Sequence, residues 1–337
     1  MPPAQRLPRT RLFVSWTPHP RATAIAEALG ASLYCPQPSS KTWPVPLRWL
    51  IKSVRTVWYV GRHRPDDIIF TNPPFVAGVV LLALARTSGA RVWSDSHSAS
   101  FNDPFWRRFE SANSWVMRRC AGVIVTNQPL AELVRSKGGR PFILNMVASQ
   151  PRRPLAGERQ TLLAPFSYAP DEPVQEVLEA AAMAPEIHLT ITGRAPESIV
   201  KGAPNNCTFT GWLSRSDYES LLGSASGVLC LTTREHTMQM CAFEALEFGV
   251  PLLASGTEVL RDYLDQGGVV FADDHSPSTL AACMQRLWRD HDQFMADALV
   301  AQIAMFDRAK MELATLEEAL SRPRDSDSQA SLHSVDR

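Results

Sequence analysis

Short apolar segments alternate with longer periodic segments along the first half of the chain. Apolar runs bounded by turn residues predict strands, and the periodic segments between them predict helices. The predicted strands are residues 11–16, 31–34, 67–71, 91–95 and 122–126. The predicted helices are residues 22–29, 45–62, 75–87, 104–119 and 129–137. Short apolar strands separated by helices indicate a parallel sheet covered on both faces, which is a doubly wound α/β domain.

The second half repeats this alternation. Its predicted strands are residues 161–167, 187–192, 206–210, 228–231 and 252–255. Its predicted helices are residues 174–184, 217–223, 237–248, 280–291 and a last helix that ends near Leu320. Residues 146–160 lose the periodicity and gather Pro, Arg and Gly, so we predict domains at 1–150 and 151–320. The tail 321–337 is rich in Ser, Asp and Arg, and we expect it to be disordered.

The net charge of zero conceals two oppositely charged halves. Residues 1–150 carry 19 Lys and Arg against 7 Asp and Glu, a net of +12, and the remainder carries 15 against 27, a net of −12. This asymmetry suggests that one half faces an anionic surface or substrate, and that attraction between the halves favours a closed arrangement. A drift in surface composition is the alternative interpretation.

Cysteine usage and hydropathy point to the cytoplasm. The six cysteines form no Cys-x-x-Cys pair, which favours a reducing compartment. The N-terminal residues are too polar for a signal-peptide core, and the longest apolar run, residues 75–85, falls short of the roughly 18 residues that span a bilayer. No His, Cys and Asp cluster shows metal-ligand spacing, so we expect neither a metal nor another cofactor.

The most informative segment is residues 227–257. Its strand would deliver Thr232, Thr233, Arg234 and His236 to the carboxyl edge of a sheet, where ligands bind. The following helix is predicted to begin at Thr237, and its first turn lacks acids, so its free amides could receive a phosphate. Glu244 interrupts the apolar surface of this helix, and a carboxylate there is costly unless a donor meets it.

This segment resembles the glycosyltransferases of the GT-B fold, in particular the family-four group. The family signature has two glutamates eight residues apart. The matching segment is Glu244-Ala245-Leu246-Glu247-Phe248-Gly249-Val250-Pro251, in which Glu244 corresponds to the second glutamate. The resemblance implies two Rossmann-like domains with a cleft between them, and a Glu244 that holds the donor ribose. His236 replaces the first glutamate, which in the family grips the transferred sugar.

Other residues of the second half are donor-site candidates. Arg194 and Arg234 follow strands and could pair phosphate oxygens. The alternative for Arg194 is a solvated surface residue. The loop 167–173 lacks the Arg and Lys that the family usually has there. Gly211, within Phe209-Thr210-Gly211-Trp212-Leu213, resembles the loop beside the nucleotide base. His236, Thr237 and Gln239 would line the sugar pocket; the alternative is that Thr237 caps the helix and His236 is exposed.

In the first half, polar residues follow several predicted strands. The resemblance implies that His97 contacts the transferred sugar, and Asp95 could orient His97 or act as a general base. A capped turn around Asp95 is the alternative. The amides of Asn72 and Asn127 could bind acceptor hydroxyls, or could serve as turn and cap residues.

Residues 41–64 are basic and aromatic. They contain Lys41, Arg48, Lys52, Arg55, Arg62 and Arg64, interleaved with three tryptophans and a tyrosine, and no acid. Such a helix can lie at an anionic membrane surface as a peripheral contact. A solvated helix with aromatic core contacts is the alternative, and no recognition motif supports nucleic acid as a partner.

We therefore predict a metal-independent glycosyltransferase. It would move a hexose-type sugar from a UDP or GDP donor to a glycan or lipid-linked acceptor, in polysaccharide or glycoconjugate biosynthesis. Family-four relatives retain the anomeric configuration, while an inverting path with Asp95 as base remains an alternative. Two further alternatives are a sugar-nucleotide epimerase or hydrolase on the same fold, and a degenerate protein that only binds a glycan or a partner.

Overall fold

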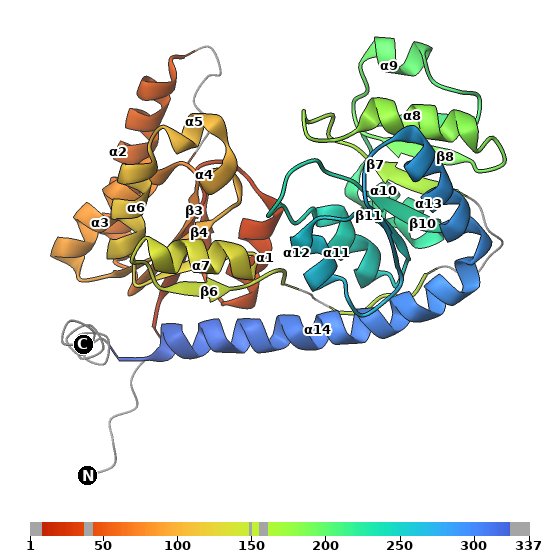
Figure 1. Cartoon of the computed structure of the whole chain (residues 1–337). Coiled ribbons are helices and arrows are strands. Elements are labelled where there is room, and N and C mark those ends of the chain that lie inside the picture. The colour runs from red at the N-terminus through yellow and green to blue at the C-terminus, as the bar shows by residue number, and fades with distance from the viewer. Residues whose placement is uncertain (1–8, 37–42, 148–149, 155–160, 324–337) are drawn as a thin grey trace. The chain divides into compact units, whose positions relative to one another are not determined.

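The computed structural model describes residues 9–36, 43–147, 150–154 and 161–323. Within these ranges the chain forms two compact units. The first comprises residues up to Val147 and those from Ala309 onward, and the second runs from Ala148 to Arg308. Each unit is built around one six-stranded sheet flanked by helices (Figure 1). All strand neighbours run parallel, which confirms the predicted pair of doubly wound domains.

The sheet of the first unit has the strand order β2-β1-β3-β4-β5-β6. Its strands are β1 (Arg11–Val14), β2 (Ser32–Tyr34), β3 (Asp67–Asn72), β4 (Arg91–Ser96), β5 (Gly122–Val125) and β6 (Pro141–Ile143). The helices between them are α1 (Pro20–Ala28), α2 (Val45–His63), α3 (Phe75–Ser88), α4 (Ala99–Asn102), α5 (Pro104–Arg107), α6 (Glu110–Arg119) and α7 (Gln128–Ser136). Every residue of β3 and β4 is buried, as expected for strands covered on both faces.

Two hydrophobic clusters cover the two faces of this sheet. On one face, residues of α2, α3, α6 and α7 pack against Leu12, Ile68 and Phe70. On the other, α1 and the last turns of α14 (His291–Ser321) pack against Phe13 and Ile69. Leu12 and Phe13 point to opposite faces because side chains alternate along a strand.

The sheet of the second unit has the strand order β12-β11-β10-β7-β8-β9. Its strands are β7 (Leu162–Pro165), β8 (Leu189–Thr192), β9 (Cys207–Gly211), β10 (Gly227–Cys230), β11 (Leu252–Ser255) and β12 (Val269–Ala272). Its helices are α8 (Val174–Met183), α9 (Glu197–Lys201), α10 (Arg215–Ser224), α11 (Met240–Glu247), α12 (Glu258–Tyr263), α13 (Pro277–Arg289) and the first part of α14. The chain leaves β7 for β8 on one side and later returns to β10 on the other. The gap between β7 and β10 is thus a topological switch point, where open α/β sheets bind ligands.

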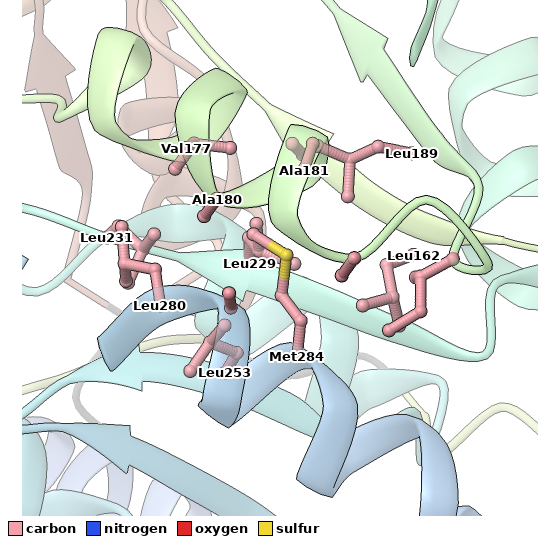
Figure 2. Packing of buried hydrophobic residues seen from close by; sticks show 14 of the residues in the cluster. Leu162, Val177, Ala180, Ala181, Leu189, Leu229, Leu231, Leu253, Leu280 and Met284 are labelled. Carbon is pink, nitrogen blue, oxygen red and sulfur yellow. The ribbon is translucent and has the colours of Figure 1, made fainter. Parts of the chain in front are cut away.

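Helices α8 and α13 cover one face of this sheet, as Figure 2 shows. Leu280 and Met284 lie one turn apart on α13 and belong to the same buried cluster as Val177 and Ala181 of α8. Burying each large aliphatic side chain contributes about 1.5–3 kcal/mol, so this cluster is a main source of the unit's stability. The packing holds the strand ends, and the loops that follow them, in fixed positions.

Several element boundaries differ from the predictions. The helix predicted at 237–248 begins at Met240, and the one predicted at 104–119 is divided into α5 and α6. The elements α4, β6, α9, α12 and β12 were not predicted. Helix α14 continues through Ser321, whereas the rest of the predicted tail, and most of the predicted boundary segment, lie outside the described residues. None of the helices in the described ranges is long and apolar enough to cross a membrane.

Candidate functional site

In the second unit, the loops that follow β7 and β10 are joined across the switch point. The Thr232 hydroxyl donates to the Asp171 carboxylate at 2.9 Å, and the Thr233 backbone N–H donates to the Asp171 carbonyl at 2.8 Å. The side chain of Arg234 forms an ion pair with the same carboxylate at 3.3 Å. Asp171 thus contacts three consecutive residues, 232–234, at the start of the loop after β10.

The network continues to the next two strands. The Thr232 N–H donates to the Ser255 hydroxyl at 2.8 Å, and this hydroxyl lies 2.7 Å from Nε2 of His275 in the loop after β12. Burial lowers the pKa of His275, which favours a neutral imidazole at physiological pH. Four strand ends are therefore linked through short polar side chains.

Two arginines at this edge were predicted to bind phosphate. Arg234 is about half exposed, so part of its guanidinium remains accessible beside Asp171. Arg194 is exposed after β8, and its guanidinium lies 5.6 Å from the ring centre of Trp212. The structure brings Arg234 to the switch point, whereas Arg194 stands two strands from β10 in the sheet.

The loop from Arg234 to Gln239 differs from its prediction. Thr237 does not begin the helix: its hydroxyl faces the Glu235 carbonyl, and Gln239 occupies the N-cap position. A turn at residues 235–236, where His236 adopts a left-handed φ of 59°, delays the helix. The prediction that Thr237 starts the helix is therefore wrong. Left-handed backbone is uncommon outside glycine, and it often marks a functional loop.

The side chain of Gln239 points toward the sheet. Its Nε2 donates to the Leu231 carbonyl at 2.9 Å, and its Oε1 accepts from the Cys230 thiol at 3.0 Å. Both ends of the amide are thus engaged with β10 and the residue after it. The amide keeps a second N–H and a second lone pair, so the contact of Gln239 with a donor sugar stays a prediction.

Glu244 lies on α11 and is met by two donors from α10. Arg215 Nη1 donates to one carboxylate oxygen at 2.7 Å, and the Tyr218 hydroxyl donates to the other at 2.9 Å. Burial and the adjacent Glu244 raise the pKa of Tyr218, so its proton stays in place. Each oxygen retains a lone pair that could accept a ribose hydroxyl. The cost of placing this acid among apolar residues is thereby offset.

Gly211 ends β9 and forms part of a close backbone contact. Its carbonyl accepts from Gly193 N–H at 2.9 Å, and both residues have left-handed φ values, 71° for Gly211 and 95° for Gly193. A Cβ on Gly193 would lie 2.0 Å from the Phe166 carbonyl oxygen, whereas one on Gly211 would meet nothing within 4 Å. The open space beside Gly211 is compatible with its predicted place next to a nucleotide base.

In the first unit, Asp95 at the end of β4 anchors a buried ionic cluster. Arg21 donates from Nε to Asp95 at 3.1 Å, and its two terminal nitrogens donate to the carbonyls of Leu144 and Asn145 at 2.7 and 2.8 Å. Burial alone would raise the pKa of Asp95, but Arg21 and His97 outweigh burial and lower it to about 2. A fully buried carboxylate with such a pKa is a weak base.

His97 is the most accessible member of this cluster. Its Nε2 lies 3.0 Å from the second carboxylate oxygen of Asp95, and its ring meets the His19 ring edge-on at 4.7 Å between centres. His19 in turn caps α1 by accepting from the Arg21 N–H. This geometry fits the role of Asp95 in orienting His97 better than the role of general base.

The two asparagines predicted to bind an acceptor are buried. Asn72 is 1% exposed, and its Nδ2 donates to Ser96 and Asn113 at 3.1 and 2.9 Å. Asn127 caps α7 by accepting from the Leu130 N–H at 3.0 Å. The structure therefore gives Asn127 the cap role of the alternative, whereas Asn72 is a buried residue at the end of β3 and neither caps a helix nor lies in a turn.

Sequence reasoning missed the partners that hold the candidate residues. Arg21, Asp171, Arg215, Tyr218 and His275 each contact a predicted residue or its loop, yet they come from other elements. Only Asp171, in the loop after the strand predicted at 161–167, had a position that gave a signal. No group of three or more His, Cys, Asp or Glu residues within the described ranges could hold a metal ion.

Comparisons with known proteins identify the fold. Residues 167–290 match the family described as Glycosyl transferases group 1. A sucrose-phosphate synthase from Thermosynechococcus elongatus has a similar structure, with a TM-score of 0.74 and 13% sequence identity over 93% of this chain and 99% of that one. The fold is GT-B. The resemblance expected from the signature segment is thereby confirmed.

Two further structures share this GT-B fold. Anabaena Alr3699/HepE in complex with UDP-glucose has a TM-score of 0.71 and 15% identity over 93% of this chain and 99% of that one. The lipopolysaccharide outer core galactosyltransferase WaaB has a TM-score of 0.60 and 11% identity over 90% of this chain and 99% of that one. No curated protein matches the sequence significantly.

Proposed function

We propose that the protein is a glycosyltransferase that moves a hexose-type sugar from a nucleoside-diphosphate sugar to a glycan or lipid-linked acceptor. The observation that carries this proposal is the family match at 167–290, which covers every loop at the switch point of the second unit. Anabaena Alr3699/HepE, a protein of the same fold, binds UDP and UDP-glucose. We infer that a donor of this class is bound here.

The donor site would lie at the carboxyl edge of β7 and β10. Arg234 and the backbone amides between His236 and Met240 would receive the diphosphate, because cationic and N–H donors stabilise a leaving anion without a metal. Glu244 would accept the ribose hydroxyls while Arg215 and Tyr218 hold its carboxylate. Gly211 would leave room for the base. Arg194, Thr237, His236 and Gln239 remain candidates for contacts with the phosphates and the sugar.

The first unit would contribute His97 to the transferred sugar. Asp95, which is itself bound by Arg21, contacts Nε2 of the imidazole, and Nδ1 on the other side of the ring would contact a hydroxyl. The low pKa and burial of Asp95 disfavour an inverting path in which it accepts the acceptor's proton. We therefore propose retention of configuration, with stabilisation of the departing diphosphate as the main catalytic effect. A lipid-linked acceptor would be reached at a membrane surface, and residues 41–64 are the segment predicted to meet one.

A ligand screen followed by product analysis tests this function. A nucleotide at about one hundred times its dissociation constant stabilises a protein by about 2.7 kcal/mol, which a thermal shift detects. We expect UDP or GDP, and the corresponding sugar nucleotide, to raise the unfolding temperature. The stabilising donor is then incubated with glycan and lipid-linked acceptors, and the products are separated.

The products separate the alternatives. Sugar joined to an acceptor, with release of the nucleoside diphosphate, is the expected result. Free sugar alone would indicate a hydrolase, and a nucleotide sugar of altered configuration would indicate an epimerase. Absence of any nucleotide response would overturn the proposal and favour a protein that only binds a glycan or a partner.

A further inference from the structure

Helix α2 turns an apolar face to the solvent. Leu50 and Val54 are each 60% exposed, and Trp58 is 68% exposed. These residues are spaced by four along the helix and therefore lie on one side of it. Leu47 and Val57 extend the same exposed side, and we call the five residues the outer face of α2.

Helix α2 packs against the first unit through its other side, without using the outer face. Thr56 and Val60 are fully buried against the first unit, and Trp49 and Tyr59 pack against the same hydrophobic cluster. A surface helix normally buries its apolar stripe and exposes its polar one. In α2 both the inner and the outer sides are apolar, so the outer face is available to a second apolar environment.

Basic residues line one flank of the outer face. At 100° per residue, Arg48, Arg55 and Arg62 form a row beside the exposed aliphatic side chains. No Asp or Glu occurs between residues 43 and 64. The Lys52 ammonium is turned inward, where it donates to the Trp16 carbonyl, and burial lowers its pKa. An environment that suits this surface must be both apolar and anionic.

A partly exposed aromatic group lies beside α2, next to Trp49 and not on the outer face itself. The Trp49 ring stacks on that of Trp106 in α5, with 6.0 Å between their centres. Phe105 and Phe109 beside it are exposed, and the two residues between Trp106 and Phe109 are exposed arginines. Aromatic rings and arginines are typical of residues that lie at the boundary between lipid and water.

We propose that the outer face of α2 binds an anionic lipid bilayer. Leu50, Val54 and Trp58 enter the boundary between headgroups and acyl chains, and Arg48, Arg55 and Arg62 contact lipid phosphates. The binding is interfacial, because no helix in the described part of the chain is long and apolar enough to cross a membrane. This inference does not depend on transferase activity.

Charge distinguishes this occupant from others. A second copy packed on the same face would bring the arginine rows of two α2 helices together, which costs free energy in an apolar contact. Nucleic acid would satisfy the arginines but would leave the exposed aliphatic side chains in water. An anionic bilayer meets both requirements.

Vesicle flotation of the full chain tests the proposal. The vesicles are phosphatidylcholine alone or phosphatidylcholine mixed with phosphatidylglycerol. The test variant is Leu50→Asp/Val54→Asp. The matched control is Val300→Asp/Ile303→Asp on α14, where both side chains are similarly exposed, at 62% and 64%, but no arginine row accompanies them. All four positions are exposed, so thermal unfolding of the variants should match that of the parent.

We expect the parent and the α14 control to float with the mixed vesicles and not with phosphatidylcholine alone. The α2 variant should lose about tenfold or more in vesicle affinity. An Arg48→Gln/Arg55→Gln/Arg62→Gln variant should show a similar loss, and its remaining binding should depend less on salt.

Three results would overturn the proposal. The first is a parent protein that does not float with the mixed vesicles. The second is equal flotation of the α2 variant and the parent. The third is a dimer on gel filtration that the α2 variant dissociates, because the outer face would then belong to an interface between copies.

Discussion

The Asp171 carboxylate accepts a hydrogen bond from the Thr232 hydroxyl at 2.9 Å, and this contact joins the loop after β7 to the loop after β10. The two residues are 61 positions apart in sequence, yet they meet because β7 and β10 are neighbouring strands. Arg234, which we propose to bind diphosphate, is held by the same carboxylate. The contact is therefore the structural basis of the candidate donor site.

Removing the hydroxyl of Thr232 should destabilise the second unit. Thr232→Val keeps the shape but removes the bond to Asp171 and the acceptor for the Arg234 N–H. We expect a loss of about 1–3 kcal/mol in the free energy of unfolding, measured with denaturant, because a buried carboxylate oxygen loses its partner. Thr208→Val, at an exposed bond to His188, should cost less than about 0.5 kcal/mol. Equal losses of unfolding free energy in the two variants would show that the bond to Asp171 stabilises the fold no more than an exposed bond does.

The ionic cluster around Asp95 should make the free energy of unfolding depend on pH. The pKa of Asp95 is about 2 in the folded chain and near 3.8 when unperturbed, so its contribution is present above pH 3.8 and is lost as pH falls toward 2. That shift corresponds to about 2 kcal/mol. Asp95→Asn should destabilise the chain at neutral pH by about 3–5 kcal/mol, because Arg21 would be left buried and unpaired.

Denaturant unfolding at a series of pH values checks this expectation. The parent should become less stable across the acid window, and Asp95→Asn should show a flatter profile there. If the stability of the parent and of the variant changed with pH in parallel, the low pKa assigned to Asp95 beside Arg21 and His97 would be contradicted.

The two glycines at the ends of β8 and β9 should respond differently to alanine. Gly193→Ala should cost about 3 kcal/mol or more, because its Cβ would overlap the Phe166 carbonyl oxygen as well as strain the backbone. Gly211→Ala should cost only the strain of a left-handed backbone at alanine, about 1–2 kcal/mol, since nothing lies within 4 Å of its Cβ. Denaturant midpoints and slopes measure both. A larger loss for Gly211→Ala would contradict the local packing.

Hydrophobic patterning predicted the architecture because parallel strands covered on both faces are nearly uniformly apolar. The strands β3, β4, β5 and β10 are buried throughout, and each was predicted within two residues of its bounds. The short strands β6 and β12 were not predicted, although all four residues of β12 are apolar. Partial burial does not explain this, because β2 and β9 are also only partly buried and were predicted. The start of α11 was misplaced because the left-handed turn at His236 leaves no composition signal.

The candidate site was less predictable than the fold. Polar residues after strands are visible in the sequence, which is how Asp95, His97 and Arg234 became candidates, and Glu244 became one through the signature segment 244–251. Their partners come from distant segments: Arg21 reaches Asp95 across 74 positions, and Arg215 reaches Glu244 across 29. Burial also changed the interpretation of Asn72 and Asn127, because whether a strand-end amide faces solvent depends on the packing of neighbouring helices.

Calorimetric titration of UDP and GDP into three proteins tests the central claim most directly. The proteins are the parent, Glu244→Gln and the matched control Glu219→Gln, which also removes a carboxylate from Arg215. We predict that one nucleotide binds the parent and Glu219→Gln similarly, and binds Glu244→Gln about tenfold or more weakly, because hydrogen bonds to a charged group contribute about 1.5–3 kcal/mol. Equal affinity of Glu244→Gln and the parent would contradict the assignment of Glu244 to the ribose.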